Sequence, residues 1–175
     1  IGGSGRLYGI DRDQAAIEAA GERLSAFPGF CAIRGNFHDI DRLLPEDVLL
    51  DGGLLDLGVS SYQLDTPDRG FSYHEDAPLD MRMDQSQALT AAEIVNGWSE
   101  DDLTRIFQDY GEEKWARQIA RVICDRRTVV PIERTGQLVS IIDAAIPKKF
   151  RQGDSAHPAR RTFQALRIAV NDELG

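Results

Sequence analysis

The sequence lacks the features that mark several large classes of protein. No apolar run approaches the ~18 residues that a membrane-spanning helix needs, and the first residues do not show the basic and then apolar pattern of a secretion signal. Only two cysteines are present, Cys31 and Cys124, and no Cys/His spacing resembles a zinc site. We therefore expect a cytoplasmic protein with no membrane span, no disulfide framework and no metal.

Basic residues are also scarce, because 20 Lys and Arg stand against 29 Asp and Glu, for a net charge of −9. This balance argues against a simple nucleic-acid binder. The charge is uneven: residues 114–161 hold 11 Lys or Arg and four Asp or Glu, whereas the remaining residues hold nine and 25. The split indicates either a basic surface on an acidic body or chance clustering on solvated helix faces, and charge alone does not separate the two.

The first third of the chain alternates short apolar runs with a helical pattern. Strands are predicted at Arg6–Asp11, Phe30–Ile33 and Gly53–Leu57, a helix at Gln14–Phe27, and a short helix at Asp39–Leu44. Strands that alternate with helices at this pace are typical of βαβ units. The predicted fold class is therefore α/β with a parallel sheet, in one domain or in one domain with an insertion.

The rest of the chain has a different pattern. Residues Ser60–Gln87 hold few periodic apolar positions, which predicts a long loop. Four helices with no strand between them are then predicted, and they indicate a helical insertion. These helices are Thr90–Asn96, Ser99–Tyr110, Glu112–Arg127 and Thr135–Ala145. A basic linker, Lys148–Ala156, and a final amphipathic helix, His157–Leu174, follow.

Asp11 ends the first predicted strand. Ligands of open parallel sheets bind beyond the carboxyl ends of the strands, where an acid can accept both hydroxyls of a nucleoside ribose. This role suits NAD and S-adenosylmethionine equally, and capping of the next helix is the alternative for such an acid. Asp13 is a second candidate for binding the ribose hydroxyls, or it caps the helix that follows. Gly2 and Gly3 are a weak signal for a cofactor loop, because no helix fits between them and Asp11.

Two more groups of polar residues follow later in the chain. Asp56 lies at the end of the third predicted strand, and Ser60 and Ser61 follow it. A ligand bound at the neighbouring strand would end at this place. The alternative is that these polar residues form a turn that caps the strand. Asp80 and Asp84 lie in the predicted long loop. They are expected to pair with arginines in a packed loop, and a divalent-metal site is the less favoured alternative.

Six segments together carry a family resemblance. They are GIDRD (9–13), LLDLGVSSYQLD (54–65), RGFS (69–72), PLDMRMD (78–84), YGEEKWARQIAR (110–121) and HPARRTFQALRIAVNDEL (157–174). In this order they resemble the RsmH/MraW family, S-adenosylmethionine-dependent methyltransferases of 16S ribosomal RNA that modify N4 of a cytidine in the decoding region. The family's usual Gly-Gly-His-Ser loop is represented by Gly2 and Gly3, without the histidine.

The resemblance implies a Rossmann-like class I methyltransferase sheet with an inserted α-helical domain. It places the S-adenosylmethionine-binding domain at residues 1–84 and 148–175, and an insertion that helps to recognise substrate RNA at residues 85–147. Asp56 matches the family's acid near the methionine end of the cofactor, and the chemistry of the transfer, described next, makes it the catalytic candidate. The implied cofactor-binding positions are Gly2, Gly3, Asp11, Phe37, Asp56 and Gln63.

The chemistry of such a reaction sets requirements on the residues. Cytosine N4 is a poor nucleophile because its lone pair is delocalised into the ring, so the amine must be held in line with the methyl group at about 3–3.5 Å. A group must also accept the amino hydrogens, and Asp56 or the backbone carbonyls at Leu57–Val59 can do so. Methylation at ring C5 normally uses a cysteine nucleophile. Because Cys31 lies in a predicted strand and Cys124 in a predicted helix, transfer to an amine is favoured.

The expected partner is 16S ribosomal RNA within the small ribosomal subunit, because an acidic body weakens affinity for naked RNA. Tyr62, Phe71 and Tyr73 are loop aromatics that can stack on a splayed base or, alternatively, anchor the loop. Five basic residues can contact phosphates. They are Lys148, Lys149, Arg151, Arg160 and Arg161. The alternative functions are an NAD-dependent oxidoreductase on a similar sheet and a non-catalytic RNA- or protein-binding module; monomer and homodimer both stay open.

Overall fold

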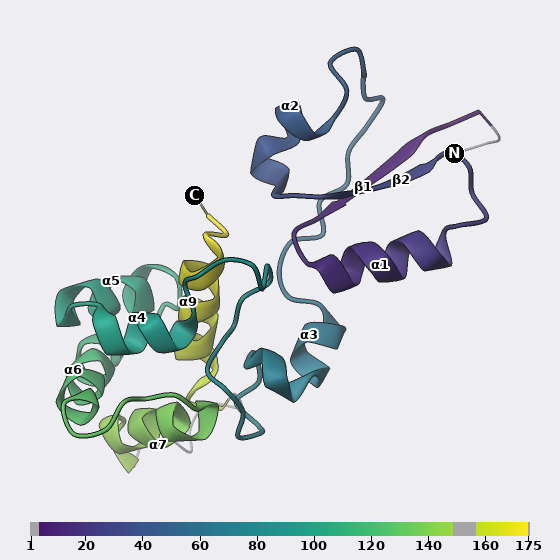
Figure 1. Cartoon of the computed structure of the whole chain (residues 1–175). Coiled ribbons are helices and arrows are strands. Elements are labelled where there is room, and N and C mark those ends of the chain that lie inside the picture. The colour runs from purple at the N-terminus through teal and green to yellow at the C-terminus, as the bar shows by residue number, and fades with distance from the viewer. Residues whose placement is uncertain (1–3, 149–156, 175) are drawn as a thin grey trace. The chain divides into compact units, whose positions relative to one another are not determined.

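The computed structural model of the chain describes residues 4–148 and 157–174. They form two compact units, whose helices and strands are labelled in Figure 1. The first unit contains the chain up to Leu57 together with Met83–Ser86, and the second contains Gly58–Arg82 and the chain from Gln87 onward. None of the helices in the described part is long and apolar enough to span a membrane.

The first unit is built on the βαβ unit that the sequence predicts. Strand β1 (Leu7–Asp11) and strand β2 (Phe30–Arg34) are parallel, and helix α1 (Gln14–Arg23) connects them (Figure 1). In the register of the two strands, Asp11 lies opposite Arg34. The α/β prediction and its parallel pairing are therefore confirmed for these two strands.

Helix α1 begins and ends for local reasons. The Asp13 carboxylate caps its first turn by accepting the backbone N–H of Ala15 at 3.0 Å. The predicted extension of the helix to Phe27 is wrong. The amide of Phe27 instead donates to the carbonyl of Leu24 at 2.9 Å and closes a turn, because a residue that precedes proline, here Pro28, disfavours helical backbone.

The first unit encloses no apolar core in residues 4–57. Two short helices, η1 (Phe37–Asp39) and α2 (Ile40–Leu43), follow β2 where a single helix over Asp39–Leu44 is predicted. Within residues 4–57 the side chain of Asp13 is buried, whereas every apolar side chain is partly or fully exposed to solvent. A two-stranded sheet with one helix against it does not cover its apolar residues.

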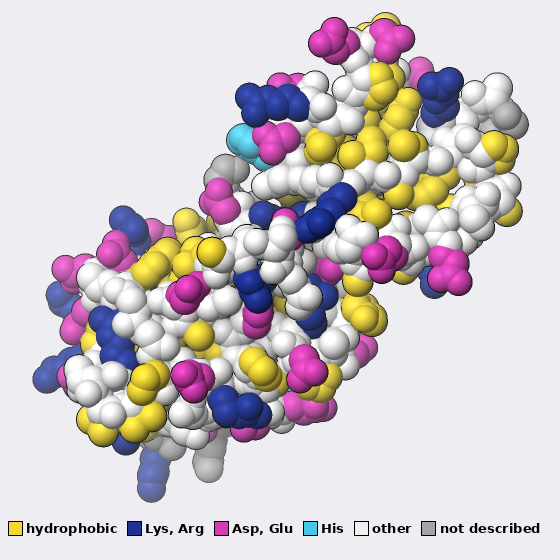
Figure 2. All heavy atoms as spheres, viewed as in Figure 1, with side chains coloured by type: hydrophobic (Ala, Val, Ile, Leu, Met, Phe, Trp, Pro, Cys, Tyr) yellow, Lys and Arg dark blue, Asp and Glu magenta, His cyan; other side chains and the backbone are white. Residues whose placement is uncertain are grey.

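The predicted strand at Gly53–Leu57 is wrong, because no strand is assigned to these residues. Leu54 is 93% exposed and Leu55 is 68% exposed, and Figure 2 shows hydrophobic side chains on the surface of the first unit. A continuous apolar run is typical of a parallel strand that is buried on both faces. In the described part of the chain the sheet holds β1 and β2, so these leucines have no neighbouring strand to pair with.

The second unit begins with two short helices in the region where the sequence predicts a loop. Helix α3 covers Ser61–Asp65 and helix η2 covers Pro67–Arg69. α3 forms because Ser60 and Gln63 make a reciprocal capping box, in which each side chain accepts the other residue's backbone N–H. The prediction of a loop over Ser60–Gln87 is therefore corrected at these two helices.

The longer helices in the described part of the second unit pack together around one apolar core. They are α4 (Ala91–Gly97), α5 (Glu100–Asp109), α6 (Ala116–Arg127), α7 (Thr135–Ala145) and α9 (Arg160–Asn171). α5 packs on α6 and α9, α6 packs on α7, and α4 contacts both α6 and α9. Phe107, Ile119, Ile123, Leu138, Ile142 and Leu166 are completely or almost completely buried. The five predicted helices are confirmed, and their apolar faces form this core.

Helices α6 and α9 are several residues shorter than predicted. α6 starts at Ala116 and not at Glu112, because Glu112 has a left-handed backbone (φ 49°) that interrupts the chain after α5. α9 ends at Asn171, since Asp172 is also left-handed (φ 46°). Both ends therefore lie at a backbone conformation that a periodic apolar pattern does not reveal.

Candidate active site

Asp11 lies where the sequence places a ribose-binding acid, at the carboxyl end of β1. Its side chain is exposed, and one carboxylate oxygen accepts the backbone N–H of Asp13 at 2.8 Å. Its carbonyl oxygen accepts the N–H of Gly35 at 3.0 Å. This bond holds the turn after β2 directly beside the end of β1. The strand-end position that the prediction requires is therefore present.

Phe37 follows that turn. Asn36 caps helix η1 by accepting the N–H of His38 at 3.2 Å, and this cap fixes the chain on either side of the phenyl ring. Phe37 is 44% exposed. An exposed carboxylate and an exposed aromatic ring thus follow the ends of two paired parallel strands, which is the chemistry that binds a nucleoside.

The contacts of Asp13 show that it caps the helix, which is the second of the two roles considered for it. Asp13 is buried, and its carboxylate caps α1 by accepting the N–H of Ala15. It is therefore committed to the helix, whereas the exposed Asp11 remains accessible to a ligand.

Arg34 makes a contact that the sequence does not predict. Its guanidinium Nη2 lies 2.6 Å from Asp84 Oδ1 and also donates to Ser86 Oγ at 3.2 Å. Ser86 donates its hydroxyl and its backbone N–H to the same Asp84 oxygen, at 2.6 and 2.9 Å. The Ser86 hydrogen bonds, followed by Arg34, outweigh partial burial and lower the pKa of Asp84 below its ordinary value of 3.8. The only sequence signal for this pair is a charged residue at the end of β2.

The other predicted site residues are less constrained or lie elsewhere. Asp56 is exposed in the extended segment before Leu57, in the same unit as Asp11. Gln63 belongs to the second unit and is buried, and its side-chain oxygen accepts the Ser60 N–H at 3.0 Å. Its role toward a cofactor stays a prediction, as does the role of Asp56. Gly2 and Gly3 lie outside the described residues.

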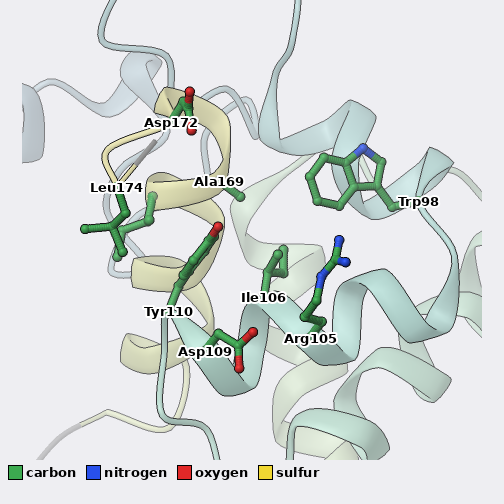
Figure 3. Close-up of a pocket in the computed structure, with 9 residues that line it drawn as sticks. Trp98, Arg105, Ile106, Asp109, Tyr110, Ala169, Asp172 and Leu174 are labelled. Carbon is green, nitrogen blue, oxygen red and sulfur yellow. The ribbon is translucent and has the colours of Figure 1, made fainter. Parts of the chain in front are cut away.

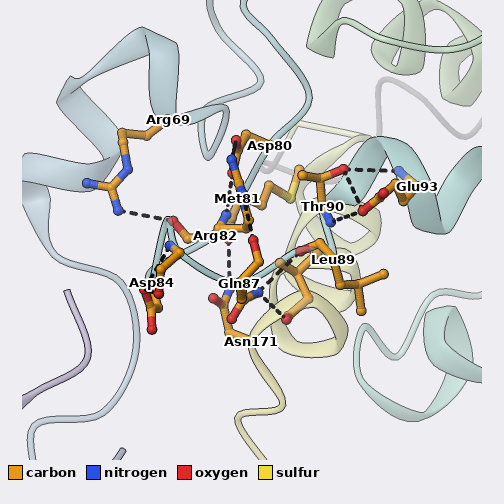
Figure 4. Close-up of polar contacts among 12 residues, drawn as sticks. Arg69, Asp80, Met81, Arg82, Asp84, Gln87, Leu89, Thr90, Glu93 and Asn171 are labelled. Carbon is orange, nitrogen blue, oxygen red and sulfur yellow. Dashed lines mark hydrogen bonds and ion pairs between the residues drawn. The ribbon is translucent and has the colours of Figure 1, made fainter. Parts of the chain in front are cut away.

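Two acids of the PLDMRMD segment pair with arginines, and Figure 4 shows the pair of Asp80 and Arg82. Asp80 binds Arg82 through two hydrogen bonds, from Nε at 2.9 Å and Nη2 at 2.7 Å, and Asp84 is held by Arg34. The predicted pairing with an arginine of the loop is therefore confirmed for Asp80, whereas Asp84 pairs with Arg34 of β2, outside the loop. In the described ranges no group of three or more His, Cys, Asp or Glu side chains is arranged to hold a metal ion.

The predicted aromatic and basic contacts divide into buried and exposed groups. Phe71 is buried, and Tyr73 stacks on His157 with ring centroids 4.7 Å apart. These two rings therefore anchor the loop, which is the alternative to stacking on a base. Tyr62 is exposed. Arg161 donates to the Glu112 carbonyl at 2.9 Å. Of the other basic candidates, Lys148 and Arg160 are exposed, whereas Lys149 and Arg151 lie outside the described residues.

A pocket in the second unit holds a set of residues that sequence reasoning did not single out (Figure 3). Its volume is about 240 Å³. Trp98, which follows α4, Arg105 on α5 and Tyr110 at the end of α5 line it together with residues of α9. The lining also includes the carboxylates of Asp109 and Asp172. The guanidinium of Arg105 pairs with Asp102 at 3.0 Å, and the two aromatic rings of the lining suit a nucleotide base.

The sequence profile of the MraW methylase family matches residues 2–175. The chain belongs to this family. The resemblance stated from the six segments is therefore confirmed. Membership implies the class I methyltransferase fold, and the α/β content of the described residues, with its small parallel sheet, agrees with that fold.

Three curated relatives of this MraW family member carry the name ribosomal RNA small subunit methyltransferase H. The protein of Heliobacterium modesticaldum is 54% identical over 179 residues, which cover 100% of this chain and 57% of the relative. The protein of Symbiobacterium thermophilum is 54% identical, with 98% of this chain and 54% of the relative covered. That of Clostridium botulinum is 54% identical, with 97% and 55% covered. The chain spans about half the length of the curated relatives it matches.

Proposed function

We propose that this MraW family protein transfers a methyl group from S-adenosylmethionine to N4 of a cytidine in the decoding region of 16S ribosomal RNA. The relatives' name supports a small-subunit ribosomal RNA substrate, and the family supports methyl transfer. The structural observation that carries the proposal is the position of Asp11 at the carboxyl end of β1, bonded through its carbonyl to the turn that leads to Phe37.

The residues at this sheet edge fit the nucleoside part of the cofactor. Asp11 offers an exposed carboxylate for two ribose hydroxyls, and Phe37 offers an exposed ring face for adenine. Bound there, the cofactor supplies an activated methyl group on its sulfonium. Gln63 is the further cofactor-contacting residue in this proposal, and Gly2 and Gly3 are the remnant of the glycine loop.

Asp56 is the proposed proton acceptor at the cytosine amine. Its carboxylate is exposed on an extended segment, so it is accessible to a substrate. By accepting an amino hydrogen it localises the N4 lone pair toward the methyl group. The carbonyls of Leu57–Val59 can accept the second hydrogen. The protein's own contribution is thus to orient N4 and to accept its hydrogens.

The helices over residues 85–147 are the proposed substrate-recognition insertion, and residues 1–84 with 148–175 the proposed cofactor domain. Support comes from the lining of the second unit's pocket, because the rings of Trp98 and Tyr110 can stack on a base. The substrate is small ribosomal subunits and not free RNA, because the net charge of −9 repels an exposed phosphate backbone.

A transfer assay tests the proposed function. The protein is incubated with methyl-labelled S-adenosylmethionine and small subunits that lack the modification, and nuclease digestion then locates the label. Label on N4 of one cytidine is expected. Label on a ring carbon, or no transfer from a preparation that binds the cofactor, contradicts the proposal. Calorimetric titration with NAD in parallel tests the oxidoreductase alternative, because that alternative requires NAD to bind more tightly.

A further inference from the structure

We propose that Asp84 positions the Arg34 guanidinium away from Asp11, so that the Asp11 carboxylate stays available to the ribose hydroxyls of the cofactor. The inference rests on the proposed cofactor role of Asp11. It assigns to Asp84 a positioning function, and not contact with the cofactor.

The strand register creates the conflict that Asp84 resolves. Asp11 and Arg34 are directly opposite each other in the parallel pair. Adjacent strands lie about 4.7–4.9 Å apart, and opposite residues project from the same face of the sheet. A guanidinium on a three-carbon stem reaches a carboxylate over that distance and binds it in bidentate fashion. Arg34 is therefore a built-in competitor for the oxygens that a ribose would use.

The contacts in the structure show Arg34 held by another acid. Its Nη2 lies 2.6 Å from Asp84 Oδ1 and donates to Ser86 Oγ at 3.2 Å. The Asp84 oxygen is itself fixed by the hydroxyl and the backbone N–H of Ser86. The acceptor for Arg34 is thus preorganised by its own neighbour, because Ser86 keeps the carboxylate in one orientation and favours its charged form.

The exposure of the pair indicates that it serves orientation more than stability. The Arg34 and Asp84 side chains are 41% and 28% exposed, and ion pairs with this much contact to water contribute little to folding stability. The pair nevertheless joins residues 50 positions apart in the sequence. The Arg34–Asp84 pair thus adds little stability but lies on the strand next to Asp11. These two properties favour a role in orienting the Arg34 guanidinium.

The test compares Asp84→Asn, Arg34→Gln and the double variant by calorimetric titration of the full chain with S-adenosylmethionine. Asp84→Asn should weaken binding on the order of 10-fold, because Arg34 then turns to Asp11. The double variant should regain the affinity of Arg34→Gln, since no cation is left to compete. Asp41→Asn on the exposed face of α2 makes the same charge change and should leave the affinity unchanged.

A second readout needs no cofactor. The NMR signal of the Asp11 carboxyl carbon should shift in Asp84→Asn and return in the double variant, and circular dichroism confirms that each variant is folded. Wild-type affinity for the cofactor in Asp84→Asn, or a double variant that binds the cofactor as weakly as Asp84→Asn, overturns the inference. If the Arg34–Asp84 pair only stabilised the fold, removing Arg34 as well would not restore the affinity. Asp11→Asn separates the two proposals. If it leaves cofactor binding intact, the proposed role of Asp11 fails; if it weakens binding and Asp84→Asn does not, only this inference fails.

Discussion

The side-chain amide of Asn171, near the end of α9, donates a hydrogen bond to the carbonyl oxygen of Met81, 2.7 Å away and 90 residues earlier in the sequence. Both residues are fully buried, and Met81 has a left-handed backbone with φ of 63°. The same amide also donates to the Arg167 carbonyl at 2.9 Å. Asn171 therefore satisfies a buried carbonyl in a strained turn and ties that turn to the last helix.

Replacing Asn171 should destabilise the second unit strongly. Asn171→Ala leaves the Met81 carbonyl buried without this donor, and we expect a loss of about 2–3 kcal/mol in the free energy of unfolding. Asn171→Asp should cost more, because a carboxylate faces the same carbonyl oxygen without an N–H. Urea unfolding followed by circular dichroism measures both. Gln118→Ala, at an exposed position of α6, is the control, and an equal effect in the control would contradict the role of Asn171.

Gly70 is required by its backbone conformation and by close packing. Its φ is 70°, and a Cβ at this position would overlap the Pro78 carbonyl oxygen and lie 2.7 Å from the Asp80 nitrogen. Gly70→Ala should therefore lower the free energy of unfolding by roughly 2–4 kcal/mol. Gly97→Ala is the matched control, because a Cβ at Gly97 meets no atom within 4 Å. The control should be neutral or slightly stabilising, and thermal melts compare the two.

The stability of the second unit should fall at acid pH, partly through Asp76. Its hydrogen bond from Arg134 Nε, 2.7 Å long, lowers the pKa of this carboxyl below its ordinary value of 3.8. A lowered pKa in the folded state stabilises the protein above the ordinary value, and this contribution disappears as the pH falls through the folded-state pKa. Asp76→Asn should therefore flatten the loss of stability between about pH 5 and pH 3. Urea unfolding across that range measures the slope of the free energy of unfolding against pH, with Asp125→Asn as the control. An identical slope in Asp76→Asn and in the wild type would refute the prediction.

The two candidate acids of the first unit should affect different kinetic constants. Asp11→Ala should raise KM for the cofactor, because it removes an acceptor for ribose. Asp56→Ala should lower kcat on the order of 100-fold with little change in cofactor affinity, because it removes the proton acceptor at the amine. Steady-state transfer to small subunits, with calorimetry for cofactor affinity, separates the two. Loss of cofactor binding in Asp56→Ala would assign that residue to the cofactor and not to the acceptor.

The pocket of the second unit should contribute to substrate affinity. Trp98→Ala removes a ring that can stack on a base, and we expect KM for small subunits to rise about tenfold. Cofactor affinity should stay unchanged. Val129→Ala, at an exposed apolar position of the same unit, is the control for lost surface area. Unchanged KM in a folded Trp98→Ala protein would exclude this pocket from substrate binding.

The parts of the fold that follow from local pattern were predictable from the sequence. β1, α1, β2 and the five longer helices form where apolar periodicity places them, and the caps at Ser99 and Thr90 fix two of the starts. The pattern fails where tertiary context decides. Leu54 lies in an apolar run that is a strand only beside partner strands. The late start of α6 depends on the single backbone conformation of Glu112, and the early end of α1 depends on the turn before Pro28.

The same division applies to the candidate site. Asp11 was predictable because it ends an apolar run, and Phe37 came from the family resemblance. Asp84 and Arg34 were not predictable as partners, because their contact joins residues 50 positions apart and no local pattern encodes it. The pocket beside Trp98 depends on the packing of α5 against α9, which likewise has no signature in one sequence.

The uncovered leucines of the first unit have a practical consequence. Leu54, Leu55 and Leu57 are exposed on a segment that forms no strand or helix, and an exposed apolar segment of this kind can pair with a complementary strand of another chain. Preparations of these 175 residues should self-associate as the concentration rises, as light scattering can measure. Leu54→Lys should delay that association without altering the thermal melting of the helical unit.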